Sequence, residues 1–263
     1  MKKKILSLCV VGLLAVTAVG GTLAYFTDTD GAKNVMTMGS VDIDQIEQQR
    51  NENGELEPFE DGKLMIPAVY ESNTNNDTWN NPKTYGGTVN VNGKDYTIFG
   101  DDVVKNAVDK IVTVKNTGKS PAYVRTLFAF EDTDDMSAKV HYMFNDANGN
   151  GELIYFPSNG DDYLQFTAGD GATYTVGYYV YDAALAAGEV SEPSLLQIFF
   201  DKSATNEDVA KAGDTYEIYV LSQAVQSEGF DNADDALNEA FGEITYDKDD
   251  MVKEWFAAIP ELF

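Results

Sequence analysis

The chain has 263 residues, of which 44 are aspartate or glutamate and 18 are lysine or arginine, so its formal net charge at pH 7 is −26. A protein this acidic repels nucleic acid and anionic membrane surfaces, and we expect no nucleic-acid partner. The length is sufficient for one large all-β domain or two small ones with a sizeable buried core.

Residues 1–24 have the organisation of a signal peptide for export. Lys2–Lys4 form a positively charged start, and the apolar run Ile5–Val19 that follows is short for a membrane span. Ala24 supplies the small residue that a signal peptidase requires, so we expect cleavage between Ala24 and Tyr25. The only cysteine lies within the apolar run, and its removal leaves a mature chain without disulfides or thiol chemistry. The alternative is an uncleaved N-terminal anchor.

The segment 25–44 is predicted to form an N-terminal strand. Its apolar residues follow a period close to two on both sides of Gly39, which indicates a strand with a kink or bulge at the glycine. These apolar residues are Met36, Met38, Val41 and Ile43. The next stretch, 45–63, is polar and acidic and contains Asn-Gly and Asp-Gly turn signals, so we expect a loop there.

A hairpin is predicted where two alternating runs flank the dipeptide Asn92-Gly93, which favours a type I′ turn. We place this hairpin at 86–99, as an insertion in the main domain.

The remainder of the chain up to residue 230 has the pattern of short strands separated by Gly, Asp and Asn turns. The predicted strands are 108–115, 121–130, 139–144, 153–156, 163–166, 172–181, 195–200 and 216–221. In the second of these, Val124, Phe128 and Phe130 share one face. We therefore predict an all-β fold, a jelly-roll-like β-sandwich over 45–230.

Helical periodicity occurs only in the C-terminal segment 231–263. The apolar positions follow i, i+3, i+4 spacing in two short stretches, the first of which ends at Gly242 and the second at Pro260. The apolar residues are Ala233, Ala236, Leu237, Ala240 and Phe241, then Val252, Trp255, Phe256 and Ile259. We interpret both stripes as surfaces that pack against the sandwich.

Three regions of the chain together resemble one protein family. The N-terminal region combines Lys2–Leu23, the sequence Ala-Tyr-Phe-Thr-Asp-Thr-Asp at 24–30 and the run Val35–Ile43. Lys115–Arg125 is similar to a central strand–turn–strand, and Ser222–Phe230 is similar to a strand-to-helix exit. On these residues the chain resembles the TasA/camelysin family of secreted Gram-positive proteins, which are exported through a SipW-type signal peptidase.

This resemblance implies a jelly-roll subunit that assembles into fibres of the biofilm matrix, in the extracellular matrix or at the cell surface of a Gram-positive bacterium. Its partners would be further copies of itself, the SipW-type signal peptidase and an accessory anchoring protein. A strand freed by cleavage would pair head to tail with the sheet edge of the next subunit. Its contact residues would be Tyr25, Phe26, Val35, Met36 and Met38. The alternative is that this segment is the first strand of its own domain.

Camelysin-like members have been described as metallopeptidases, but this chain lacks the residues for zinc hydrolysis. Such sites generally need three protein ligands, typically with two histidines in a His-Glu-x-x-His motif, and the only histidine here is His141. We expect His141 to lie on a strand face, and we expect no enzymatic activity. The competing function is a monomeric cell-surface adhesin or binding module that would use the loops 71–83 and 145–162.

Calcium is the one candidate cofactor. Asp146, Asn148 and Asn150 occupy positions 1, 3 and 5 of a calcium-loop pattern, a glycine follows at position 6, and Glu152 adds a carboxylate. Position 12 is Pro157, where an EF-hand requires a bidentate glutamate, so the match is incomplete. The alternative is an acidic hairpin turn.

Arg125 is one of two arginines in the chain and lies within a predicted strand. We expect it to form an intramolecular ion pair with Glu131 or Asp132. The alternative is a contact with a neighbouring subunit.

Overall fold

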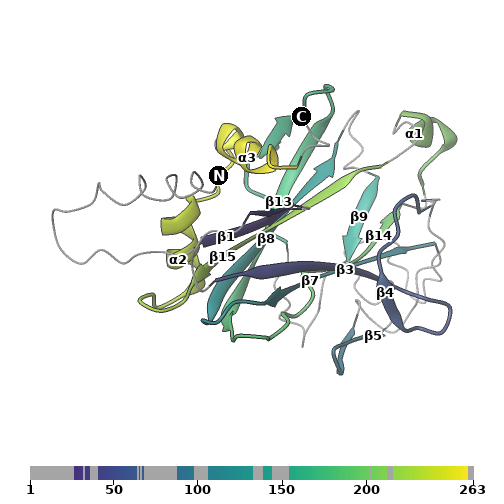
Figure 1. Ribbon diagram of the computed structural model, residues 1–263. Coiled ribbons are helices and arrows are strands. Elements are labelled where there is room, and N and C mark those ends of the chain that lie inside the picture. Colours follow the sequence, from purple (N-terminus) through teal and green to yellow (C-terminus); the bar gives the residue numbers. More distant parts are fainter. Residues whose placement is uncertain are drawn as a thin grey trace, which may run out of the picture.

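The structure is a computed structural model that describes residues 27–31, 33–35, 41–63, 65, 67, 88–97, 106–132, 139–143, 154–201, 203–211 and 216–259. Within these residues the chain consists mainly of antiparallel β-strands with a few short helices (Figure 1). The prediction of an all-β sandwich is confirmed.

The larger sheet has six strands, with β12 and β2 at its two edges. The order across this sheet is β12 (Gln165–Thr167), β13 (Thr173–Leu185), β8 (Ala122–Glu131), β15 (Ile218–Gln226), β1 (Thr27–Gly31) and β2 (Lys33–Val35). All neighbouring pairs are antiparallel. The first described strand, β1, therefore lies beside the last one, β15, as Figure 1 shows.

The second sheet has five strands. Their order is β4 (Leu56–Pro58), β3 (Ile43–Arg50), β7 (Val108–Asn116), β14 (Leu195–Phe200) and β9 (Val140–Met143). From β7 onward the main strands alternate between sheets, because β7, β9 and β14 belong here while β8, β13 and β15 belong to the six-stranded sheet. This repeated crossing between two antiparallel sheets makes them the two layers of a β-sandwich.

The space between the sheets is filled by apolar side chains from alternate strand positions. The Phe128 and Phe130 rings stack with their centroids 5.6 Å apart, and Val124 belongs to the same buried cluster, as the alternation in the sequence predicts. Gly177 of β13 makes room for two core side chains. A Cβ at this position would lie 2.5 Å from Cγ2 of Ile154, which is closer than packed carbon atoms approach.

Both outer faces of the sandwich are partly covered. The hairpin of β5 (Thr88–Val91) and β6 (Lys94–Thr97) packs on the five-stranded sheet, and its turn residues Asn92 and Gly93 have φ angles of 52° and 85°, as a type I′ turn requires. A smaller hairpin of β10 (Ser158–Asn159) and β11 (Asp162–Tyr163) and the short helix α1 (Asn206–Lys211) lie in the connections.

The helices α2 (Ala233–Phe241) and α3 (Asp249–Phe256) cover the six-stranded sheet (Figure 1). Leu237 of α2 packs in a cluster with Val225 of β15, and Phe256 of α3 packs in a cluster with Leu127 of β8. The apolar stripes of the C-terminal segment therefore face the sandwich, as we interpret them from the sequence.

The prediction of a loop over 45–63 is wrong, because this range contains two strands. β3 continues to Arg50, and β4 follows after a short turn. The polar composition is misleading because most side chains of β3 beyond Ile43 are only half-buried, while its main chain pairs with β7 as far as Gln48. A strand at this position tolerates polar residues on both faces.

Candidate functional site

The segment predicted as a donor strand begins within the chain's own sheet. β1 pairs with β15 from Thr27 opposite Val225 to Gly31 opposite Leu221. β2 then folds back along β1 and ends at Val35, the one predicted contact residue that the structure describes. In the single chain, β1 is thus the first described strand of its own domain. This is the alternative that the sequence analysis gives to a donor strand.

The other predicted site residues lie outside the described residues. These are Ala24 and Tyr25 at the expected cleavage site, the contact residues Phe26, Met36 and Met38, and the calcium-loop residues Asp146, Asn148, Asn150 and Glu152. Within the part of the chain that is described, no group of three or more His, Cys, Asp or Glu side chains is arranged to hold a metal ion.

β15 offers a longer edge than β1 covers. β8 pairs with all nine residues of β15, from Ile218 to Gln226, whereas β1 pairs with only five, from Leu221 to Val225. Among the strands in the described ranges, none pairs with residues 218–220 on the side where β1 lies. The edge that receives the N-terminal strand is therefore only partly occupied.

Val220 directs its backbone groups toward this open part of the edge. In antiparallel pairs, hydrogen-bonded residues alternate with residues that are not hydrogen-bonded to that partner. The amide of Glu131 donates to the carbonyl of Glu217 at 3.1 Å, so the odd-numbered residues of β15 form the hydrogen-bonded pairs with β8. The even-numbered residues, including Val220, therefore present their N–H and C=O groups on the side of β1.

The side chain of Gln45 on β3 occupies this position. Its Nε2 donates to the Val220 carbonyl at 3.3 Å and to Oε1 of Glu47 at 2.8 Å. Its Oε1 accepts a hydrogen bond from Oγ of Ser222 at 2.9 Å. The glutamine amide thus takes the place that the backbone N–H of a longer partner strand would take.

β3 is fixed to the domain at its N-terminal end by the turn between β7 and β8. The carbonyl of Asp42 accepts hydrogen bonds from the amides of Thr117 at 2.8 Å and Gly118 at 3.0 Å. Val41 and Ile43, on either side of this carbonyl, are both buried in the core between the sheets. The chain from Val41 onward is therefore held in place independently of β1.

Asn116 gives this turn its shape. Its side chain is fully buried, and Nδ2 donates to the carbonyls of Ser120 and Leu185, both at 2.9 Å. Its Oδ1 accepts from the amide of Gly118 at 2.9 Å. The same amide contacts Asp42, so one asparagine links the turn to the start of β3.

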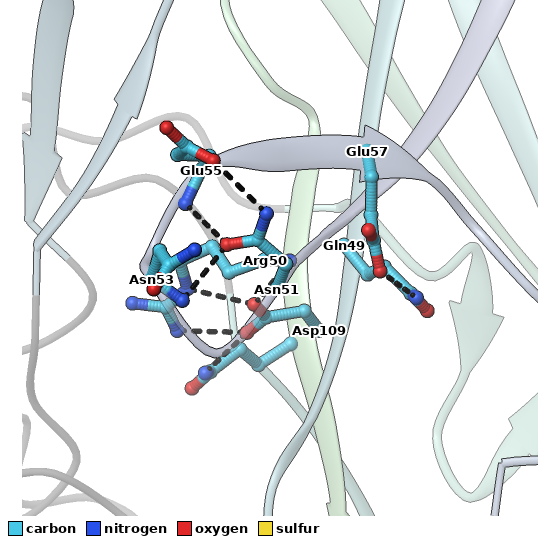
Figure 2. A network of polar contacts seen from close by, with 8 residues as sticks. Gln49, Arg50, Asn51, Asn53, Glu55, Glu57 and Asp109 are labelled. Atoms are coloured by element: carbon cyan, nitrogen blue, oxygen red, sulfur yellow. Dashed lines mark hydrogen bonds and ion pairs between the residues drawn. The ribbon is translucent and has the colours of Figure 1, made fainter.

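The C-terminal end of β3 is fixed by Arg50 and Asp109 (Figure 2). Arg50 donates from Nε to Oδ2 of Asp109 at 2.7 Å and from Nη2 to Oδ1 at 2.8 Å, a bidentate ion pair. Nε2 of Gln197 on β14 donates to the same carboxylate at 2.7 Å. Burial raises the pKa of Asp109, but the hydrogen bonds from Arg50 and Gln197 outweigh burial and hold that pKa below its ordinary value.

Asn51 closes the turn that follows β3, also visible in Figure 2. Its Oδ1 accepts hydrogen bonds from the amides of Asn53 at 2.9 Å and Glu55 at 3.0 Å, an Asx turn. β3 thus enters and leaves the five-stranded sheet at fixed points.

The predicted ion pair of Arg125 with Glu131 or Asp132 is wrong. Six residues along a strand span about 20 Å, so neither acid is within reach of the guanidinium. Oε2 of Glu131 instead accepts from the amide of Glu217, and Oδ2 of Asp132 accepts from Thr175.

Arg125 is instead buried between the six-stranded sheet and the C-terminal helices, with 1% of its surface exposed. Nε donates to Oε1 of Gln223 at 2.8 Å, and Nη1 donates to the Gly242 carbonyl at 3.2 Å. The guanidinium also lies 5.5 Å from the ring centroid of Phe241 and 5.2 Å from that of Trp255. Burial lowers the pKa of Arg125 to about 10.

His141 lies in β9, in the strand-face position that we expect. Its Nε2 is 3.0 Å from Oδ2 of Asp201, and its ring centroid is 5.2 Å from that of Phe199. Through these contacts, His141 packs against β14 and the residue that follows it in the five-stranded sheet.

Comparisons of the chain with protein-family models, with curated proteins and with solved structures give no match. The resemblance to the TasA/camelysin family therefore stays a prediction. Within the described ranges, no helix combines the length and the apolar character needed to cross a membrane. The partly covered edge of β15 and the strand that pairs with it are the features from which a function can be derived.

Sequence patterns do not single out two residues of this site. Gln45 lies in a polar stretch without a signature, and its contacts with β15 arise only when the two sheets pack. Asn116 begins the Asn-Thr-Gly turn, whose turn propensity is visible in the sequence. Its role in holding Asp42 is not visible there, because the two residues are far apart along the chain.

Proposed function

We propose that this protein is a secreted structural subunit that assembles into extracellular fibres of a biofilm matrix by head-to-tail exchange of its N-terminal strand. The observation that carries the proposal is the edge of β15, where β1 covers five of nine residues while β3 is fixed at both ends. The chain on the C-terminal side of Val41 can thus keep its fold when β1 leaves.

The pairing of β1 with β15 depends mainly on main-chain hydrogen bonds. The sequence of β1 is Thr-Asp-Thr-Asp-Gly, which contains no large apolar residue. A net contribution of about 0.5–1.5 kcal/mol per hydrogen bond makes such a pairing modest in strength. The same strand from a second copy forms the same bonds, so exchange conserves the contacts. It is opposed only by the entropy that is lost on association.

Exchange of this kind produces a filament rather than a closed dimer when donor and acceptor point to different neighbours. Each copy gives its N-terminal strand to one neighbour and receives a strand from another, which is a heterologous contact that propagates. Removal of residues 1–24 supplies the trigger, because before cleavage the donor is tethered to the signal segment.

A reversible lock on β1 tests the proposal. The secreted, signal-cleaved protein carrying Thr27→Cys and Val225→Cys would form a disulfide between register partners of one chain. We expect monomers by size-exclusion chromatography and electron microscopy when the disulfide is formed, and unbranched filaments after reduction. Each single cysteine variant, under the same oxidising conditions with the thiol blocked, is the control. Filaments from the locked protein would overturn the proposal.

The unmodified secreted protein distinguishes this function from the adhesin. It should form filaments, and screening of its negative charge by acid or calcium should favour them. A protein that starts at Gly39 should keep its β-sheet circular dichroism spectrum and remain monomeric. Persistent monomers of the unmodified protein under all these conditions would favour a monomeric adhesin or binding module.

A further inference from the structure

The sequence of β1 does not specify where it pairs along β15. Thr27–Asp28 and Thr29–Asp30 are the same dipeptide repeated. The side chains of a strand also repeat every two residues, so a shift of β1 by two residues places the same residue types at the same faces. After a shift toward Ile218, Thr27 would lie opposite Gln223, which Thr29 faces in the observed register.

β15 by itself does not prevent this shift. It continues to Ile218, beyond the last residue that β1 pairs with, and β8 holds it in the sheet along its whole length. A shifted β1 would therefore still have a main-chain partner for each of its five residues. Some other group must make the observed register more stable than the shifted one.

We infer that Gln45 is the residue that sets the register of the strand paired with β15. Its Nε2 donates to the Val220 carbonyl, the acceptor that a shifted strand would need for its own backbone N–H. In the observed register, β1 ends at Gly31 opposite Leu221, directly before this occupied carbonyl. Gln45 thus completes the edge in one register and blocks it in the other.

Gln45 is held firmly enough to act as a stop. The hydrogen bond from Ser222 to Oε1 of Gln45 fixes the orientation of the side-chain amide, and Nε2 also donates to Glu47. β3, which carries Gln45, is anchored at Asp42 by the β7–β8 turn and at Arg50 by Asp109. A side chain on a fixed strand with both amide groups bonded has little freedom to move aside.

Gln45 would limit the register of a strand from the same chain and of a strand from a neighbouring copy. The first case stands on the contacts of the single chain, and the second rests on the proposed function. In a filament, one register at every junction gives one subunit spacing, whereas a mixture of two registers gives junctions that differ by two residues, about 7 Å along the strand.

Disulfide trapping in the secreted, signal-cleaved protein tests the inference. The pair Thr29→Cys with Gln223→Cys reports the observed register, and the pair Thr27→Cys with Gln223→Cys reports the shifted one. Both pairs share the change at Gln223, so the loss of its bond to Arg125 affects them equally. Each pair is prepared with Gln45, with Gln45→Ala, with Gln45→Glu and with Gln48→Ala, and the fraction of intrachain disulfide is measured under mild oxidation.

With Gln45 present, the observed pair should form clearly more disulfide than the shifted pair. Gln45→Ala should raise the ratio of shifted to observed disulfide roughly three- to tenfold, as expected for the loss of one hydrogen bond. Gln45→Glu has nearly the same volume but cannot donate to Val220, so it should have a similar effect without a cavity. Gln48→Ala, on the same strand and paired with Ile111 of β7, should change nothing.

An unchanged ratio in both Gln45→Ala and Gln45→Glu would overturn the inference, as would equal trapping of both registers when Gln45 is present. The trap is read in single chains, so it is independent of filament formation. Monomers that never assemble but respond to Gln45 in the trap would contradict the proposed function and support the register stop.

Discussion

Nε of Arg125 on β8 donates a hydrogen bond at 2.8 Å to Oε1 of Gln223 on β15, the strand that pairs with β1. Nη1 of the same arginine donates to the carbonyl of Gly242, directly after the end of α2. α2 has no basic residue in its last turn, so the sheet supplies the positive charge that the negative end of the helix dipole favours.

Replacing Arg125 should separate the effects of hydrogen bonding and volume. Arg125→Ala removes the bonds to Gln223 and Gly242 and leaves a cavity, so we expect a loss of about 2–4 kcal/mol in the free energy of unfolding. Arg125→Met fills much of the same volume and should reduce the free energy of unfolding by less. Methionine has no charge, so folding no longer includes the cost of removing a guanidinium from water. Urea denaturation measures both. Equal stability of Arg125→Ala and the parent protein would show that the arginine does not hold the helices.

Asn116→Ala should weaken the attachment of β3 to the β7–β8 turn. The substitution removes the donor to the buried carbonyl of Leu185 and to the half-buried carbonyl of Ser120, and we expect a loss of about 2–3 kcal/mol in the free energy of unfolding. Asn159→Ala, at an exposed position of β10, should change stability by less than about 0.5 kcal/mol. Similar small effects of both substitutions would contradict the role assigned to Asn116.

The ion pair between Arg50 and Asp109 should make stability depend on pH in the acid range. The pKa of Asp109 is lowered in the folded protein, so the carboxylate contributes stability at pH values above its ordinary pKa of 3.8. This contribution is lost as the pH falls below 3.8 and through the lowered pKa. Asp109→Asn should therefore reduce stability at pH 6, and the difference from the parent should shrink toward pH 3. A constant difference over that range in urea denaturation would argue against the ion pair as the source.

Tyr174 should contribute to unfolding at high pH. Burial and the carboxylate of Glu217, which accepts its hydroxyl hydrogen bond at 3.0 Å, raise its pKa above the ordinary value of 10. A raised pKa gives stability that is present below pH 10 and lost as the pH rises further, because the unfolded chain releases the proton first. The lowered pKa of Arg125 acts in the opposite sense above pH 10. Tyr174→Phe should thus make the fall in stability between pH 10 and 11.5 less steep, as followed by circular dichroism.

Local patterns in the sequence predict the strands whose side chains alternate strongly. The face shared by Val124, Phe128 and Phe130 and the Asn92-Gly93 hairpin both follow from neighbouring residues. β3 does not, because its side chains are half-buried and its position is set by pairing with β7. Polarity alone therefore suggests a loop where the chain forms a strand.

The candidate site is less predictable than the fold, because its groups come together only through long-range packing. Gln45 meets Val220 across the two sheets, and Arg125 meets Gly242 at the end of a helix that follows β15. The expectation of an ion pair for Arg125 considers acids close to it in sequence. In the folded chain, its partners are two side-chain amides, a carbonyl and two aromatic rings.

The pairing of β1 with β15 also determines when this part of the sheet can close. A ribosome makes the chain from its N-terminus, so Thr27–Gly31 exists long before Leu221–Val225 has been synthesised. Contacts of such high sequence separation form late in folding, since a very long loop must close first. Every newly made molecule therefore passes through an interval in which β1 can pair with β2 but not yet with β15 of its own chain.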